Sequence, residues 1–279
     1  MTSWKPPILR SVQIRALSWN LFHGRDGPPD PSLYTLRSKL LRITEHNDTH
    51  VQVNRDLYGE FARMLAGAEW DVALLQECPP RWAQPFAGAC DAEAHRVLTS
   101  RNWIPPVQGA IHRFNPDLPG SWEGGSNTTL VRRLGIAEAR DLVIRPGHPE
   151  RRTMAFTRLR DGTCVANFHA SNDNDPLAEE EVRLAAETAI GWAADAPLIF
   201  GGDFNLRPRS SALFGELEQR FGLRSPTGPD AIDHVLARGL DSLDTPRQWP
   251  AAGREIPWNG LVLRLSDHAP VEALFSPAR

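Results

Sequence analysis

The stretch IFGGDFNLR, residues 199–207, ends an apolar run with two glycines and then places a carboxylate and an amide two residues apart. The run at 197–200 has the character of a buried strand, and glycine lets a backbone turn sharply or approach another group closely. In an extended chain Asp203 and Asn205 would point to the same side. A carboxylate and an amide at the end of a buried strand indicate a functional site.

The overall composition is that of an ordinary globular protein, with 279 residues, 41% hydrophobic and 23% charged. The stretches rich in proline and glycine, at 24–31, 114–125 and 224–230, are too short for a domain linker. We therefore expect a single domain spanning residues 1–279, with large loops, and a monomer.

The location and the partners are only partly constrained by composition. We expect no membrane span, because the apolar runs are too short, and no signal peptide, because residues 1–19 lack a continuous apolar core. Cys78, Cys90 and Cys164 have no metal-ligand spacing, which favours free thiols and a cytoplasmic protein. The net charge of -3 is no general signal for nucleic acid, although an acidic protein can carry a local basic cleft.

The periodicity of the apolar residues predicts a mixed α/β chain in which strands outnumber helices. Three helices are expected, at 54–68, 176–194 and 210–220. No GxGxxG motif is present, and the alternation is too irregular for a simple dinucleotide-binding unit. Strands are expected at 12–19, 71–77, 106–113, 127–132, 153–159, 163–169, 197–202, 231–237, 260–265 and 269–275.

Six of these apolar runs lead into or begin with acidic, amide or imidazole side chains. Rigid strands hold such groups in fixed mutual geometry, so active sites are commonly assembled at strand ends. The residues, in chain order, are Asn20, then Gln76 and Glu77, His169, Asp203 and Asn205, Asp233 and His234, and finally Asp267 and His268.

These residue types indicate the hydrolysis of a phosphate ester around a hard cation. Glu77 and Asp267 are oxygen ligands suited to Mg²⁺ or Mn²⁺, and Asn20 adds a neutral oxygen. The cation would neutralise charge on the phosphoryl oxygens and assist the attack of water.

The remaining polar residues suit the other parts of such a reaction. His169 and His268 can carry charge near neutral pH and contact an anionic phosphate. Asp233 is a natural partner to orient one of the histidines, and Asp203 can take a proton from water.

The motifs LSWNLFHG, LLQE, VANFHAS, GGDFN, IDHVLARG and LSDHAPV, in this order, resemble those of the endonuclease/exonuclease/phosphatase superfamily. They extend from Leu17 to Val271, which is nearly the whole chain. The resemblance implies the DNase I-like fold, an α/β (α+β) four-layer sandwich in which two packed mixed β-sheets are flanked by helices.

The resemblance also implies residue roles. Asn20 and Glu77 match the metal-site pair, Asp267 matches a further metal ligand, and the implied cofactor is Mg²⁺ or Mn²⁺. The remaining matches are His169 and His268 as histidines at the scissile phosphate, Asp203 as the base, Asn205 on phosphate and Asp233 as the partner of His268. Asn127, in GGSNTTLVRR, matches a phosphate-binding asparagine through a partial motif.

Two departures argue against one branch of the superfamily, the abasic-site endonucleases. Those enzymes usually carry an acid two residues after the first asparagine, where this chain has Phe22, and a tyrosine in mid-chain. The only tyrosines here are Tyr34 and Tyr58, so abasic-site repair is not expected.

Several residues have a structural interpretation beside the functional one. We expect His234 to be structural, since alternation turns it away from Asp233, whereas His23 is open between packing and lining the cleft. The acidic run at 179–181 is expected to be a solvated helix start. Two further groups stay open between substrate binding and structure: the arginines Arg132, Arg133, Arg151 and Arg152, and the loop tryptophans Trp103 and Trp122.

The leading hypothesis is a metal-dependent phosphodiesterase, in particular a nuclease that cuts DNA or RNA. The alternative is a phosphatase or phosphodiesterase for a small phosphorylated metabolite or lipid headgroup, using the same site. The nuclease predicts a long open cleft lined by arginines, and the alternative predicts a closed pocket built from 24–55 and 101–126. A third hypothesis, a catalytically dead binding module, is disfavoured because every acid that the reaction needs is present.

Overall fold

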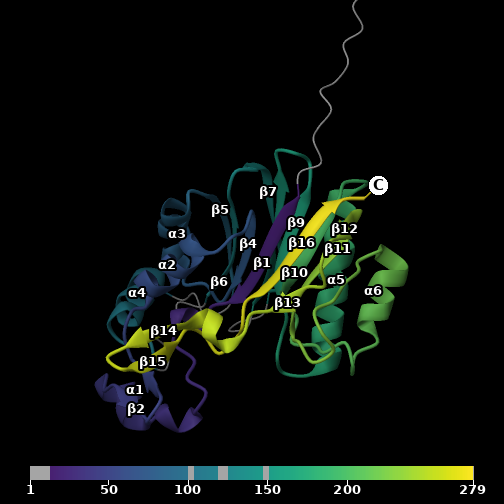
Figure 1. The fold of residues 1–279 in the computed structure, drawn as a ribbon. Coiled ribbons are helices and arrows are strands. Elements are labelled where there is room, and N and C mark those ends of the chain that lie inside the picture. The colour runs from purple at the N-terminus through teal and green to yellow at the C-terminus, as the bar shows by residue number, and fades with distance from the viewer. Residues whose placement is uncertain (1–12, 100–103, 119–124, 147–150, 279) are drawn as a thin grey trace, which may run out of the picture.

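The computed structural model describes residues 13–99, 104–118, 125–146 and 151–278. Two large sheets pack face to face and carry helices on their outer faces (Figure 1). The four-layer sandwich implied by the resemblance is therefore confirmed. No helix in these four ranges is both long and apolar enough to cross a membrane.

The first sheet has the strand order β12-β16-β1-β4-β6-β5, and β13 also pairs with β16. Its central strands, β1 and β4, run parallel, so that their carboxyl ends reach the same edge of the sheet. The bounds are β1 (Ile14–Asn20), β4 (Val72–Gln76), β5 (Glu93–Leu98), β6 (Ser126–Val131), β12 (Leu240–Ser242), β13 (Arg247–Gln248) and β16 (Val271–Pro277).

The second sheet has the order β11-β10-β9-β8-β7, and its parallel pair is β9 with β10. The bounds are β7 (Ile136–Arg145), β8 (Arg152–Leu159), β9 (Cys164–His169), β10 (Leu198–Asp203) and β11 (Asp233–Arg238).

The outer layers are helical. The helices α2 (Tyr58–Gly67) and α3 (Ala83–Cys90) cover the first sheet, and α5 (Asp175–Ala193) and α6 (Leu213–Phe221) cover the second. Because side chains alternate along a strand, β10 contributes to two hydrophobic cores. Ile199 packs in the core between the sheets, while Leu198 and Phe200 pack in the core under α5.

A smaller lobe lies beside the sandwich, at the lower left of Figure 1. It contains a four-stranded sheet in the order β14-β15-β3-β2 together with α1 and α4. The bounds are α1 (Leu36–Leu41), β2 (Glu45–His46), β3 (His50–Gln52), α4 (Pro105–Phe114), β14 (Glu255–Trp258) and β15 (Leu261–Arg264), with short 3₁₀ turns at Phe22–Gly24, Pro31–Leu33, Pro80–Trp82 and Ala251–Arg254 along the chain.

The strand predicted at 106–113 is wrong, because this segment is the helix α4. Two prolines occupy its first turn, where a missing N–H costs nothing, and the helix then presents His112 to the interior. The sequence pattern also missed β5 and β7, two edge strands that have one fully buried position between them and therefore no clear apolar alternation.

Gly202 sets the contact between β9 and β10. Its φ is +142°, and a Cβ built there would lie 1.8 Å from the carbonyl oxygen of Phe168 on the neighbouring strand. Only glycine fits this position, which explains the second glycine of GGDFN.

Buried polar groups fix the segment that follows β1 to the lobe. Arg25 Nε donates to Asp117 Oδ1 (2.7 Å), and Gln52 Nε2 donates to Asp117 Oδ2 (2.5 Å). Asp26 Oδ2 accepts from the N–H of Val53 (2.6 Å), but Asp26 Oδ1 has no hydrogen-bond partner among the described residues. Burial, with a contribution from Asp117, raises the pKa of Asp26 to about 8.

We expect Gly202→Ala to destabilise the protein by about 3 kcal/mol or more, because a β-carbon there overlaps backbone atoms that cannot move aside. Urea unfolding would measure it. Gly191→Ala is the matched control, since it lies in α5 with open space around the new methyl group, and it is expected to stabilise by about 0.5–1 kcal/mol. Equal effects of the two substitutions would contradict this account of Gly202.

We expect Asp26→Asn to remove a pH-dependent loss of stability. The folded protein keeps a proton on Asp26 that the unfolded chain releases near pH 4, so stability falls as pH rises from about 4 to about 8. The amide keeps an acceptor for Val53 without the buried charge, so the variant should gain about 1–3 kcal/mol at pH 9 and little at pH 5. Unfolding at both pH values would measure this, and an equal change at both would contradict it.

Candidate active site

The strand register brings the predicted acids and histidines together at one edge of the two sheets. In the second sheet Asp203 is directly paired with His169 on one side and with Asp233 on the other. In the first sheet Asn20 is paired with Gln76, the residue before Glu77. Four positions earlier on three of these strands, Ala16, Val165 and Ile199 fill the space between the sheets, so Asn20, His169 and Asp203 lie on the same inner face.

Asp203 is buried and links the two sheets. Its Oδ2 accepts from Asn20 Nδ2 (2.9 Å) on β1, and its Oδ1 accepts from the N–H of Asn205 (3.1 Å). Burial and the nearby Asp233 raise the pKa of Asp203. Both carboxylate oxygens are thus held in place by neutral donors.

Asn205 does not continue the strand, contrary to the extended geometry expected from the sequence. Its φ is +54°, and its Nδ2 donates to the carbonyl of Ala170 (3.1 Å), in the loop after β9. The backbone turn gives Asp203 an N–H donor and fixes the loop beside His169.

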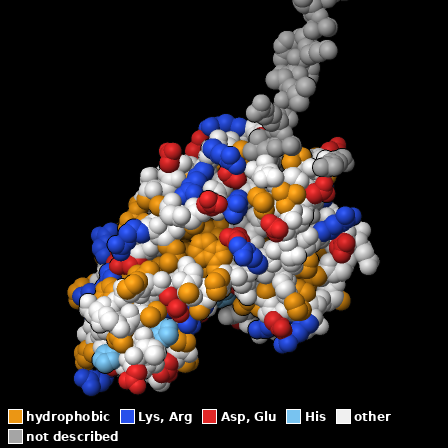
Figure 2. Space-filling model, viewed as in Figure 1, with side chains coloured by type: hydrophobic (Ala, Val, Ile, Leu, Met, Phe, Trp, Pro, Cys, Tyr) orange, Lys and Arg blue, Asp and Glu red, His pale blue; other side chains and the backbone are white. Residues whose placement is uncertain are grey.

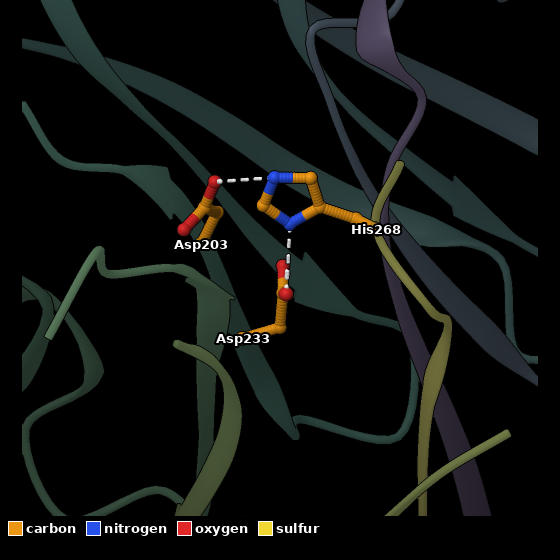
Figure 3. Close-up of side chains that lie close together, drawn as sticks. All are labelled: Asp203, Asp233 and His268. Carbon is orange, nitrogen blue, oxygen red and sulfur yellow. Dashed lines mark hydrogen bonds and ion pairs between the residues drawn. The ribbon is translucent and has the colours of Figure 1, made fainter. Parts of the chain in front are cut away.

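His268 is the bridge between two carboxylates (Figure 3). Its Nδ1 lies 2.9 Å from Asp233 Oδ2, and its Nε2 lies 3.8 Å from Asp203 Oδ2. Burial lowers the pKa of His268, but the two carboxylates outweigh burial and raise it well above its usual value. The imidazole therefore carries a proton on both nitrogens at neutral pH and donates to Asp233.

His169 is in the opposite state. Its Nε2 lies 3.5 Å from Asp203 Oδ2 and 4.0 Å from Glu77 Oε1. Burial lowers its pKa to about 3, with further lowering by Arg152 and by charge on His268 and His23, so the ring is neutral at pH 7. Two histidines beside one carboxylate thus differ in protonation.

Glu77 begins the turn after β4, with a φ of +47°. Its Oε2 lies 3.2 Å from His23 Nε2, so His23 lines the site, one of the two interpretations that the sequence left open. Burial raises the pKa of Glu77, and the donor Asn20 partly offsets this rise. Asp267 stands at the rim with 48% of its side chain exposed.

The donor set of Glu77, Asp267 and Asn20 fits a hard divalent cation. Burial raises the pKa of Asp267, and repulsion from Glu77 adds to the rise, which a cation between two acids would relieve. One ligand atom each of Asp203, Asp233 and His268 also lie within 4.8 Å of one another. That second group is less suited to a cation, because His268 keeps its proton in the hydrogen bond to Asp233.

A neutral polar layer lies directly below the ionisable groups. The pattern of polar residues at strand ends predicted Gln76 but not its partner Asn167. Gln76 Nε2 donates to Asn167 Oδ1 (2.8 Å), and Asn167 Nδ2 donates to the carbonyls of Leu75 (3.2 Å) and Thr128 (3.1 Å). The signal was present, since Asn167 stands two residues before His169 and so shares its face.

No hydrogen bond among the described residues joins Asn127 to the carboxylate cluster. It is buried on β6, and its Nδ2 donates to the carbonyl of Thr153 (2.6 Å) on β8, so its amide bridges the two sheets. Its Oδ1 has no partner among the described residues.

His234 is structural, as alternation predicted. It faces α6, its Nε2 is 3.0 Å from the carbonyl of Leu206, and its ring packs against Phe214.

The four arginines divide into two pairs. Arg132 donates to backbone carbonyls of 65–70 and Arg133 pairs with Asp71, at the edge of the first sheet opposite the site. Arg151 donates to the carbonyl of Thr99, and Arg152 lies at the site edge. The interpretation of Trp103 and Trp122 concerns residues outside the described ranges.

Glu181 corrects the expectation that the run at 179–181 is solvated. It is buried at the second turn of α5, and it accepts from both the N–H (2.7 Å) and the hydroxyl (2.9 Å) of Ser171. Ser171 Oγ in turn accepts from Arg152 Nε (3.1 Å). Nothing in the sequence of the acidic run at 179–181 indicates that one of its three glutamates is buried.

Comparison with solved structures places this fold among known ones. A protein of the endonuclease/exonuclease/phosphatase family from Bacteroides thetaiotaomicron is similar with a TM-score of 0.62 and 14% identity, covering 97% of this chain and 100% of that chain. A mannosyl-6-phosphatase from the same organism is similar with a TM-score of 0.60 and 14% identity, covering 94% and 99%. Truncated TDP2 from Caenorhabditis elegans gives 0.55 and 14%, covering 95% and 97%.

No curated protein matches the sequence. The model of the endonuclease/exonuclease/phosphatase family matches residues 17–268, a range that begins just before Asn20 and ends at His268. The site described above therefore lies wholly within the matched range, and this chain belongs to the endonuclease/exonuclease/phosphatase family.

Proposed function

We propose that this protein is a divalent-metal-dependent hydrolase of phosphate esters, and that its substrate is a compact phosphoester. The observation that carries the proposal is the placement of a neutral and a charged histidine within 4 Å of one buried carboxylate, Asp203. Membership of the family supports a phosphoester hydrolase.

Glu77, Asp267 and Asn20 would hold the cation, for which we propose Mg²⁺ or Mn²⁺. Asn20 Oδ1 accepts from the N–H of Phe22 (2.9 Å) and keeps a second lone pair. When bound, such a cation neutralises charge on phosphoryl oxygens.

Asp203 would accept the proton of the attacking water. Asn20 and the N–H of Asn205 fix its two oxygens, and its raised pKa makes it a stronger base than an exposed carboxylate. The hydrogen bonds hold the carboxylate in position before substrate arrives.

The two histidines would divide the work at the phosphate. His268 holds a proton at neutral pH, so we assign it to the developing negative charge on the leaving oxygen, with Asp233 orienting the ring. Neutral His169 would donate a single N–H to a phosphoryl oxygen.

Two observations favour a compact substrate over a long polynucleotide. Arg132 and Arg133 lie away from the site, so they form no rim along a cleft there. On the face drawn in Figure 2, Lys and Arg are interspersed with Asp and Glu and form no continuous basic stripe among the described residues. Polynucleotide cleavage is the second candidate, because the exposed Asp267 leaves one side of the site open to a polymer.

We expect Asp233→Asn to shift the alkaline limb of the activity profile to lower pH. The charged form of His268 exists below its raised pKa, and removing the Asp233 carboxylate lowers that pKa. The measurement is kcat/KM between pH 5 and 10 for wild type and variant. Asp141→Asn, an exposed acid paired with His95, is the control. An unchanged alkaline limb would show that His268 is not the group that titrates.

We expect hydrolysis to require Mg²⁺ or Mn²⁺ and to stop in EDTA. The panel is plasmid DNA, single-stranded DNA, RNA, sugar phosphates and a phosphorylcholine ester. Asp203→Asn should lower kcat by about 10²–10⁴-fold. Glu77→Gln should weaken the response to Mg²⁺ by about tenfold or more. Cleavage of polynucleotides alone would select the second candidate, and full activity in EDTA would exclude the proposed role of the cation.

A further inference from the structure

The loop after β9 is held by a buried carboxylate from a different layer. Glu181 on α5 takes two hydrogen bonds from Ser171, and Ser171 stands two residues after His169. The preceding residue, Ala170, accepts from Asn205 Nδ2 and donates its N–H to the carbonyl of Asp203 (2.9 Å). One short loop thus joins His169, Asn205 and α5.

The hydrogen bonds define the direction of the Ser171 hydroxyl. A carboxylate can only accept, so the single hydroxyl proton points to Glu181 Oε1. The oxygen of Ser171 is then left with lone pairs only, and one of them accepts from Arg152 Nε. Glu181 therefore orients the Ser171 hydroxyl so that its lone pairs, and not its proton, face Arg152.

Arg152 lies at the edge of β8 where the site is built. In the β8–β9 ladder Met154 is paired with Phe168, which puts Arg152 beside the segment that follows His169. Arg152 is 6% exposed, and its charge is among the causes, after burial, that lower the pKa of His169. A buried guanidinium beside a cluster of phosphate-type ligands is suited to an anion, because its donors form a rigid fork.

We propose that Arg152 is an anion-binding residue of the site and that Glu181 is a positioning residue, which orients Arg152 through the hydroxyl of Ser171. This inference rests on the proposed function, since the anion is the substrate phosphate. It makes α5, a helix of the outer layer, part of the apparatus that sets affinity for phosphate.

The experiment compares Arg152→Ala, Arg152→Lys, Ser171→Ala and Glu181→Gln with wild type. Three quantities are measured: KM and kcat on the best phosphoester, the inhibition constant for inorganic phosphate, and the melting temperature. Glu179→Gln is the matched control, because Glu179 lies on the same helix and also accepts from a serine hydroxyl, that of Ser211 (2.6 Å). Arg140→Ala, an exposed arginine on β7, controls for loss of charge.

We expect Arg152→Ala to weaken phosphate inhibition and to raise KM by about 10- to 100-fold, the range of a hydrogen bond between charged groups. Arg152→Lys should rescue little, because a point charge cannot reproduce the fork. Ser171→Ala and Glu181→Gln should each raise the phosphate inhibition constant by about threefold to tenfold, and the two controls should not.

The decisive measurement is the phosphate inhibition constant of the double variant Ser171→Ala/Arg152→Ala, compared with that of each single variant. If Ser171 acts through Arg152, its substitution has no further effect on phosphate affinity once Arg152 is gone. Effects that multiply, or an unchanged phosphate constant in Arg152→Ala, would overturn the inference, even if the melting temperatures fall.

The hydrolase proposal can fail while the inference about Arg152 and Glu181 holds, and a binding experiment distinguishes the two. If wild type hydrolyses no phosphoester, the same variants are titrated with inorganic phosphate in Mg²⁺ and followed by ³¹P NMR. Phosphate binding that is weakened by Arg152→Ala and Ser171→Ala would keep the inference while the hydrolase proposal falls. A wild type that binds no phosphate would overturn the inference itself.

Discussion

The hydrogen bond from Asn20 to Asp203 is the interaction on which the candidate site depends. It joins the carboxyl end of β1 in one sheet to the carboxyl end of β10 in the other, and both partners are buried. A buried carboxylate with an unmade hydrogen bond is costly, so this contact fixes the relative position of the two sheets at the edge where the chemistry is proposed. The glycines before Asp203 allow the approach, because a Cβ at Gly201 would meet Leu74 of the first sheet at 2.9 Å.

The space between the sheets changes in character along the strands. It is apolar at Ile199 and Val235, it becomes neutral and polar at Gln76 and Asn167, and it ends in ionisable groups. The apolar part supplies the burial that stabilises the sandwich. In the polar part both ends of the Asn167 amide are hydrogen-bonded, whereas Gln76 Oε1 has no partner among the described residues. The bonds that are made hold this layer in place beneath the charged groups.

Burial combined with fixed neighbours makes the pKa values of the two histidines differ. His268 lies between Asp233 and Asp203 and keeps its proton, whereas His169 is more deeply buried, has cations nearby and stays neutral. Groups of the same type whose environments push their pKa values apart are the usual way in which a site divides acid and base roles at one pH. The division here follows from which strand ends are neighbours, since Asp233 and His169 flank Asp203 on opposite sides.

The sequence by itself determined a mixed α/β chain and the chemical types at the strand ends, because local periodicity reports which face of a strand is buried. The four-layer arrangement followed from the resemblance of its motifs to a known family. It placed Asp203, His169 and Asp233 on ends that the structure joins, and it turned His234 away correctly. Only the tertiary structure showed that 106–113 is a helix, that Arg132 and Arg133 belong to the far edge, and that Glu181 is buried against Ser171. The burial of a charge and the pKa of a histidine depend on partners that are distant in sequence, and a local pattern carries no information about them.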